Sequence, residues 1–72
     1  MKCTIRIIWD DEARVWYTDS IDMPIFLNDA SYDGLIERVR VAAPETLEES
    51  NGYIGPIDLI FESVRVEKAL AS

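Results

Sequence analysis

Residues 16–30 read WYTDSIDMPIFLNDA, and this stretch decides how the chain is arranged. It begins as a β-strand, breaks at Met23-Pro24 and resumes as the apolar run 25–27. Proline cannot donate a hydrogen bond to a strand ladder, and the residue before it is pushed toward an extended conformation. We therefore expect 25–27 to form a short strand at the edge of a sheet, joined by a bend to a strand at 14–19.

The residues before this stretch predict a β-hairpin. Residues 2–9, KCTIRIIW, are rich in β-branched and aromatic residues, and their side chains alternate between the two faces of a strand. One face then carries Cys3, Ile5, Ile7 and Trp9. The polar break at 10–13 has the length of a hairpin turn. We therefore expect the strands at 2–9 and 14–19 to be antiparallel neighbours.

The residues after this stretch predict a helix. Ser31 is a favourable N-cap, and Asp33 lies in the first turn, where the helix dipole favours negative charge. Apolar residues then recur with helical spacing: Tyr32, Leu35, Ile36, Val39, Ala42 and Ala43. Because Pro44 removes a backbone donor, the helix is expected to kink or to stop near residues 40–44, and Asn51-Gly52 supplies a C-terminal stop.

A fourth strand is expected at 57–67, after a turn at Gly55-Pro56. The element order is then β-β-β-α-β, and a right-handed crossover through the helix returns the last strand parallel to the first. The sequence therefore predicts one α+β domain over residues 1–72. It has two layers, a sheet of strand order 3-2-1-4, and one helix on one face.

Large apolar residues occur on both faces of the expected strands, although the single helix covers only one face. A monomer of this kind would expose an apolar patch, and such patches usually mark an interface. The candidate interface residues are Ile8, Trp16, Ile25, Phe26, Ile60, Val64 and Val66. Because a small chain often gains stability by association, we expect a homo-oligomer.

The charge balance narrows the choice of partners. Fourteen acidic residues against seven basic ones give a net charge of −7, which disfavours nucleic acid and anionic membranes as partners. A basic protein is the better match, and the candidate docking acids are Glu45, Glu48 and Glu49. The alternative is that these acids form a solvated face that keeps the protein soluble. Without a signal peptide or the ~18 apolar residues of a membrane span, a cytoplasmic location is expected.

The sequence carries no recognisable catalytic constellation. It contains no histidine that could activate Cys3 or a serine. The expected strand order is that of RNase H-like nucleases, but their two-metal site needs an acid on the first strand, and 2–9 holds none. Asp10, Asp11 and Glu12 lack the spacing of a calcium loop. We therefore expect no enzymatic activity, no metal and no cofactor.

The chain resembles the HicB-like superfamily, which comprises the partner-binding domains of HicB-type antitoxins and a related small stand-alone family of unknown function. The resemblance rests on Trp16, TDSIDMP at 18–24, Phe26-Leu27, Ala30-Ser31 and LIERV at 35–39. It implies a partial RNase H-like fold without catalytic acids, and a module that binds a small basic RNA-cleaving toxin. The family pattern has glycine after the proline, where this chain has Ile25.

Two interpretations of function follow. In the first, a non-enzymatic interaction module self-associates and neutralises a basic protein of the toxin type. In the second, the chain is a stand-alone oligomeric domain with a structural or regulatory role and without a toxin partner.

Overall fold

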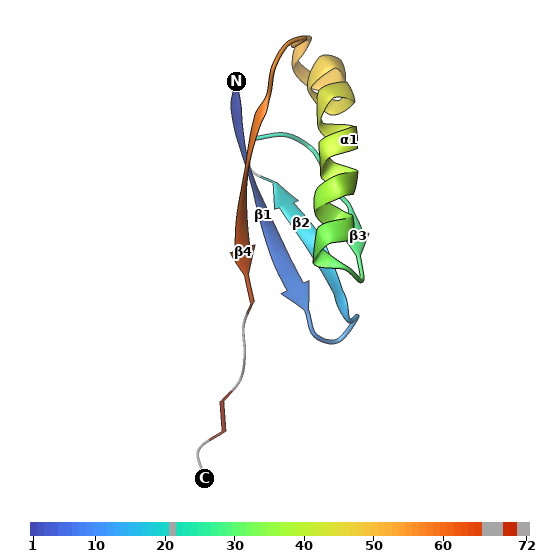
Figure 1. Ribbon diagram of the computed structural model, residues 1–72, viewed down its shortest axis with the longest axis vertical. Helices are drawn as coiled ribbons and strands as arrows, with labels where there is room; N and C mark the ends of the chain where they lie inside the picture. The colour runs from blue at the N-terminus through green and yellow to red at the C-terminus, as the bar shows by residue number, and fades with distance from the viewer. Residues whose placement is uncertain (21, 66–68, 71–72) are drawn as a thin grey trace.

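The computed structural model describes residues 1–20, 22–65 and 69–70. Within them the elements are β1 (Lys2–Asp10), β2 (Val15–Ser20), β3 (Asn28–Asp29), α1 (Tyr32–Asn51) and β4 (Asp58–Val64). The strands form one sheet in the order β3-β2-β1-β4, and α1 lies against one of its faces (Figure 1). β2 is antiparallel to both β1 and β3, whereas β4 is parallel to β1. The predicted α+β fold, its strand order and its parallel last strand are confirmed.

The hairpin turn between β1 and β2 is held by the side chain of Asp10. Its carboxylate Oδ1 accepts hydrogen bonds from the backbone N–H groups of Glu12 and Ala13, at 3.1 and 3.2 Å. The N–H of Arg14 donates to the carbonyl of Asp10 at 2.8 Å, and Arg14 adopts a φ of 59°. This local acceptor explains why the polar stretch after the first strand forms a tight turn.

The third strand lies at 28–29, and the prediction that it lies at 25–27 is wrong. The cause is the side chain of Thr18 on the neighbouring strand. Its hydroxyl donates to the carbonyl of Ile25 at 2.8 Å and accepts from the N–H of Leu27 at 3.0 Å. The backbone N–H of Thr18 still donates to the carbonyl of Leu27 at 3.0 Å, but the Thr18 side chain occupies the other two ladder groups of 25–27. The position of the third strand at the sheet edge is as predicted.

Both ends of α1 carry the caps that the sequence predicts. The hydroxyl of Ser31 accepts a hydrogen bond from the N–H of Gly34 at 3.1 Å. At the other end Gly52 has a φ of 68°, and its N–H donates to the carbonyl of Glu48 at 3.0 Å. Glycine adopts this left-handed conformation without a steric penalty, so the helix ends there.

Helix α1 does not stop at Pro44 but continues to Asn51. The residue that explains the continuation is Leu47, which is fully buried one turn later. Full burial of a leucine side chain stabilises by ~1.5–3 kcal/mol, which is comparable to the ~3 kcal/mol cost of a proline inside a helix. Tertiary packing therefore decides that the helix continues past Pro44 and does not stop there.

The core lies between α1 and the sheet. Its buried apolar members are Cys3, Ile5, Ile7, Met23, Ile25, Leu35, Val39, Ala43 and Leu47. The alternation along β1 correctly predicts its contribution, because the odd-numbered residues face the helix. Burial, together with the nearby negative charge of Asp22, raises the pKa of the Cys3 thiol. This thiol is therefore a small packed side chain and not an activated nucleophile.

Strand β4 begins and ends within the expected range of 57–67. In the parallel pairing with β1, Lys2 lies opposite Asp58 and Ile8 lies opposite Val64. Ile57, which precedes the strand, packs against the core. Residues 66 and 67 of the expected strand lie outside the described residues.

Candidate functional site

The first candidate surface lies on the face of the sheet that α1 does not cover. The odd-numbered residues of β1 face the helix, so Ile8 lies on the opposite face. The strand register places side chains of β2 and β4 beside Ile8. Tyr17, Ile60 and Val64 are 37%, 43% and 36% exposed there. We call the set Ile8, Tyr17, Ile60 and Val64 the sheet patch.

The sheet patch is organised in rows that run across the strands. Ile8 lies opposite Tyr17 on one side and opposite Val64 on the other. Neighbouring strands are ~4.8 Å apart, so the side chains of this row are contiguous. The next row contains Arg6 between Asp19 and Glu62, with the guanidinium of Arg6 3.8 Å from the carboxylate of Asp19. An apolar row is thus bordered by a charged one.

The second candidate surface is a groove between the segment 24–27 and α1. Two hollows of about 330 and 290 Å³ adjoin, because both are lined by Leu27 and Ala42. Phe26 is 85% exposed and Val41 is 72% exposed, although both are large apolar side chains. We call the set Pro24, Phe26, Leu27, Val41 and Ala42 the helix groove.

Charged side chains of α1 border the helix groove. At one end Arg38 lines it, donates a hydrogen bond to the carbonyl of Asn28, and lies 3.9 Å from the carboxylate of Asp29. Beyond the other end, Glu45 lies within one helical turn of Val41 and Ala42, and Glu49 lies one turn after Glu45. Glu48 lines a different hollow, beside Ile54. All three glutamates are exposed, and none of them forms an ion pair with a described residue. The groove therefore has an acidic end.

Most of the predicted interface residues lie on these two surfaces. Ile8, Ile60 and Val64 belong to the sheet patch, and Phe26 belongs to the helix groove. The structure therefore does not bring them together into one site, because the sheet separates the two surfaces. Val66 lies outside the described residues.

Trp16 is half-buried and Ile25 is buried, so neither belongs to the exposed residues of the two surfaces, although Ile25 lines one hollow of the helix groove. Ile25 is 3% exposed and belongs to the core, because the chain after Pro24 turns it beneath α1. Trp16 lies opposite Trp9 in the hairpin and so shares its face, the one toward the helix. Its ring centroid is 5.2 Å from that of Trp9 and 5.1 Å from that of Tyr32. Its role in this structure is packing.

Two surface residues were not predicted. Tyr17 could have been found from alternation, since the residue after Trp16 must point away from the helix and therefore lie beside Ile8. Val41 lies outside the apolar stripe of α1, and a single exposed valine on a helix is common. Only the hollow that Val41 shares with Leu27 shows that Val41 is part of a larger apolar surface.

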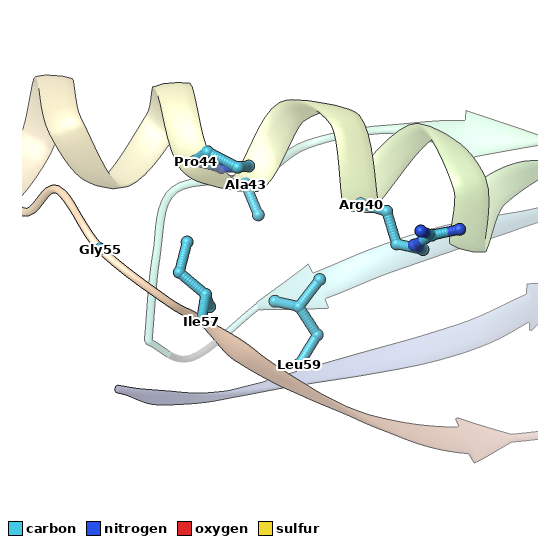
Figure 2. Close-up of a pocket in the computed structure, with 6 residues that line it drawn as sticks. All are labelled: Arg40, Ala43, Pro44, Gly55, Ile57 and Leu59. Carbon is cyan, nitrogen blue, oxygen red and sulfur yellow. The ribbon is translucent and has the colours of Figure 1, made fainter.

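A third hollow, of about 190 Å³, lies between α1 and the chain that enters β4 (Figure 2). Ile57 and Leu59 point from that chain toward Ala43 of the helix. The one charged side chain that lines this hollow, among the described residues, is Arg40, and its guanidinium is 2.7 Å from the carboxylate of Glu37. The hollow is thus mainly apolar, with one guanidinium that is already paired.

Within residues 1–20, 22–65 and 69–70, no three side chains of histidine, cysteine, aspartate or glutamate form a group that could hold a metal ion. In the same part of the chain, no helix is long and apolar enough to cross a membrane. What these residues do present is two exposed apolar surfaces, one on each side of the sheet.

Comparison with known proteins identifies a family. A family model described as a domain of unknown function, DUF1902, matches residues 2–70. The crystal structure of the hypothetical protein TTHA1013 from the extreme thermophile Thermus thermophilus is similar, with a TM-score of 0.81 and 30% sequence identity. The match covers 96% of this chain and 100% of that chain. No curated protein matches. The chain therefore belongs to the DUF1902 family.

Proposed function

We propose that this protein is a non-enzymatic interaction module that self-associates and that binds and neutralises a small basic RNA-cleaving protein, in the manner of HicB-type antitoxin domains. The observation that carries the proposal is the helix groove, in which Phe26 is 85% and Val41 is 72% exposed. Burial of such side chains by a partner contributes ~1.5–3 kcal/mol each. Exposed apolar surface of this kind marks sites of protein interaction.

The charge around the helix groove favours a basic partner. Glu45 and Glu49 lie beyond its acidic end and Glu48 lies on the same helix, in a chain whose net charge is −7. Complementary charge steers the encounter of two proteins and suppresses wrong pairings. We therefore expect association with the partner to slow as the salt concentration rises.

The resemblance to the HicB-like superfamily supports the same surface. Phe26-Leu27 is among the motifs that carry the resemblance, and both residues line the helix groove. LIERV at 35–39 lies on α1, which forms the other wall. Two of the segments that carry the resemblance thus contribute to the proposed site.

The test is co-expression of this chain with the product of the small open reading frame beside its gene. The wild-type chain should relieve growth arrest by that product and form a complex with it in size-exclusion chromatography. Phe26→Ser should lose both effects. Ile54→Ser is the matched control, because Ile54 is 80% exposed but lines a hollow that shares no residue with the helix groove. If Phe26→Ser relieved the growth arrest as well as the wild-type chain does, the proposed site would be contradicted. If the wild-type chain did not relieve the growth arrest, the antitoxin role would be contradicted.

The sheet patch favours a second candidate, a stand-alone oligomeric domain with a structural or regulatory role and no toxin partner. This patch lies on the face of the sheet opposite the helix groove, so self-association there needs no other protein. A chain that self-associates, yet neither binds nor counteracts the neighbouring gene product, would support this candidate.

A further inference from the structure

We infer that the open face of the sheet is the self-association surface, and that its occupant is a second copy of this chain related by a two-fold axis running across the strands along the row of Ile8. The inference rests on the self-association in the proposed function and names its surface and its symmetry. It excludes the helix groove as the contact between copies, which leaves that groove for another partner.

The order of side chains along β1 on the open face carries the inference. Arg6, Ile8 and Asp10 follow one another at every second residue, so this face reads basic, apolar, acidic. Ile8 is also the centre of an apolar row, with Tyr17 on one neighbouring strand and Val64 on the other. Along β1 the charge therefore changes sign across an apolar row, although Asp19 and Glu62 lie on either side of Arg6.

A surface of this kind is complementary to itself. A two-fold interface brings the same surface of both copies together, so that if residue i contacts residue j, then j also contacts i. When the axis runs along the apolar row, Ile8 lies over Ile8 of the second copy. Arg6 of each copy then lies over Asp10 of the other, which creates two symmetry-related pairs of opposite charge.

The other two-fold axis within the face runs along β1, and the charges disfavour it. It would place Arg6 over Arg6 of the second copy. It would also exchange β2 and β4 and thereby place Asp19 over Glu62, since both residues lie beside Arg6 in the register. Like charges that face each other across an interface suppress the arrangement that brings them together.

Both members of the proposed pair are available for it. Arg6 contacts Asp19 at 3.8 Å, and the Arg6 side chain remains 40% exposed. Asp10 uses its Oδ1 atom in the hairpin turn, and no described residue donates a hydrogen bond to its Oδ2 atom. Packed sheets lie ~10 Å apart, a separation that an arginine side chain reaches across.

The size of the surface sets the strength of the contact. The axis lies two residues from the end of β1, so only residues 6–10 of that strand overlap in the two copies. Three strands at ~4.8 Å spacing and about 16 Å of strand give a contact of roughly 240 Å² per copy. Stable interfaces bury about 800 Å² per partner, so this contact belongs to the weak class. We therefore expect monomers and dimers to exchange, with a dimer fraction that rises with protein concentration.

Sedimentation of the full chain over a range of concentrations tests the surface. Ile8→Lys should abolish the dimer, whereas the matched control Phe26→Lys, in the helix groove, should leave it intact. The opposite result would overturn the inference while self-association itself stands. A wild-type chain that stays monomeric at every concentration would overturn both the inference and the proposed self-association. Circular dichroism of each variant confirms that it is folded.

A double-mutant cycle tests the pair across the interface. Arg6→Gln and Asp10→Asn, the second of which keeps an acceptor for the hairpin turn, should each weaken the dimer roughly three- to tenfold. The double variant should be no weaker than either single one. Within one copy the two residues are about 13 Å apart along the strand, so additive effects would mean that they do not meet between copies and would overturn the pairing.

Cross-linking tests the direction of the axis. Packed sheets lie ~10 Å apart, too far for a direct disulfide, so a bis-maleimide linker of about 10 Å is used. With the axis across the strands, only residues on the apolar row lie over their own copy, so Ile8→Cys should form a linked dimer and Lys2→Cys should not. With the axis along β1, both variants would link, and that result would overturn the proposed symmetry. The native thiol of Cys3 is buried, so it should not compete.

Discussion

The Thr18 hydroxyl accepts a hydrogen bond from the backbone N–H of Leu27 at 3.0 Å, which joins β2 to an irregular segment nine residues further along the chain. The same hydroxyl donates to the carbonyl of Ile25. Thr18 is the one buried polar residue among the described part of the chain, at 6% exposure. It fixes the wall of the helix groove, because Leu27 lines that groove and Ile25 anchors the same segment in the core.

Thr18→Val should lower the free energy of unfolding by about 1–3 kcal/mol. The substitution keeps the shape of the side chain but leaves the N–H of Leu27 without this acceptor and the carbonyl of Ile25 without this donor. Urea unfolding followed by tryptophan fluorescence measures the effect. Thr46→Val, a half-buried helix position, is the control, and an equal loss there would show that the hydroxyl of Thr18 is not the cause.

Pro44→Ala should raise the free energy of unfolding. Pro44 lies inside α1 on its exposed side, and alanine restores a backbone donor in a helix interior, where proline is less favourable by ~3 kcal/mol. We expect a gain of ~1–3 kcal/mol in thermal or urea unfolding. Pro24→Ala, outside the helix, should bring no such gain. A loss of stability in Pro44→Ala would mean that the proline ring itself is needed for packing.

Gly52→Ala should destabilise the protein by ~1–2 kcal/mol, because a side chain at a φ of 68° meets the backbone. The space around this position is open, so the cost comes from the backbone conformation alone. Gly52→Asn is the matched variant and should cost less, since asparagine tolerates this conformation. Thermal unfolding of both variants gives the comparison, and equal losses would contradict the explanation.

The Cys3 thiol should make the protein less stable at alkaline pH. Burial and the charge of Asp22 raise the pKa of this thiol above its ordinary value of 9.0. Above that value the unfolded chain loses the thiol proton before the folded one does, so stability falls as the pH rises further. Urea unfolding at increasing pH checks this, and Cys3→Ala should reduce the dependence. Thiol-specific labelling of the native protein should be slow for the same reason.

The sequence predicted the parts of the fold that depend on local patterns. The alternation in β1 reveals its buried face, the polar residues after Asp10 reveal the turn, and Ser31 and Gly52 define the limits of α1. The parallel return of β4 follows from a general rule of chain handedness. Each of these features is decided within a few residues or by topology alone.

Prediction from the sequence failed where a contact between residues far apart in the chain determines the structure. The position of β3 depends on the Thr18 hydroxyl, and the length of α1 depends on the burial of Leu47. Trp16 was assigned to the exposed face because large apolar residues occur on both faces of the strands. Its partner in the hairpin, Trp9, shows instead that Trp16 lies on the face toward the helix. The helix groove could not be predicted, since it forms only where Leu27 and Ala42, which come from two separate segments, line the same hollows.

The central position of β1 has a consequence for synthesis of the chain. One edge of β1 pairs with β2 within the same hairpin, but the other edge pairs residue 2 with residue 58. A ribosome must therefore produce the whole of α1 before the second edge of β1 can be covered. During that interval the nascent hairpin presents an unpaired strand edge, which invites pairing with other chains. Folding should consequently be limited by the late arrival of β4, and isolated N-terminal fragments should aggregate.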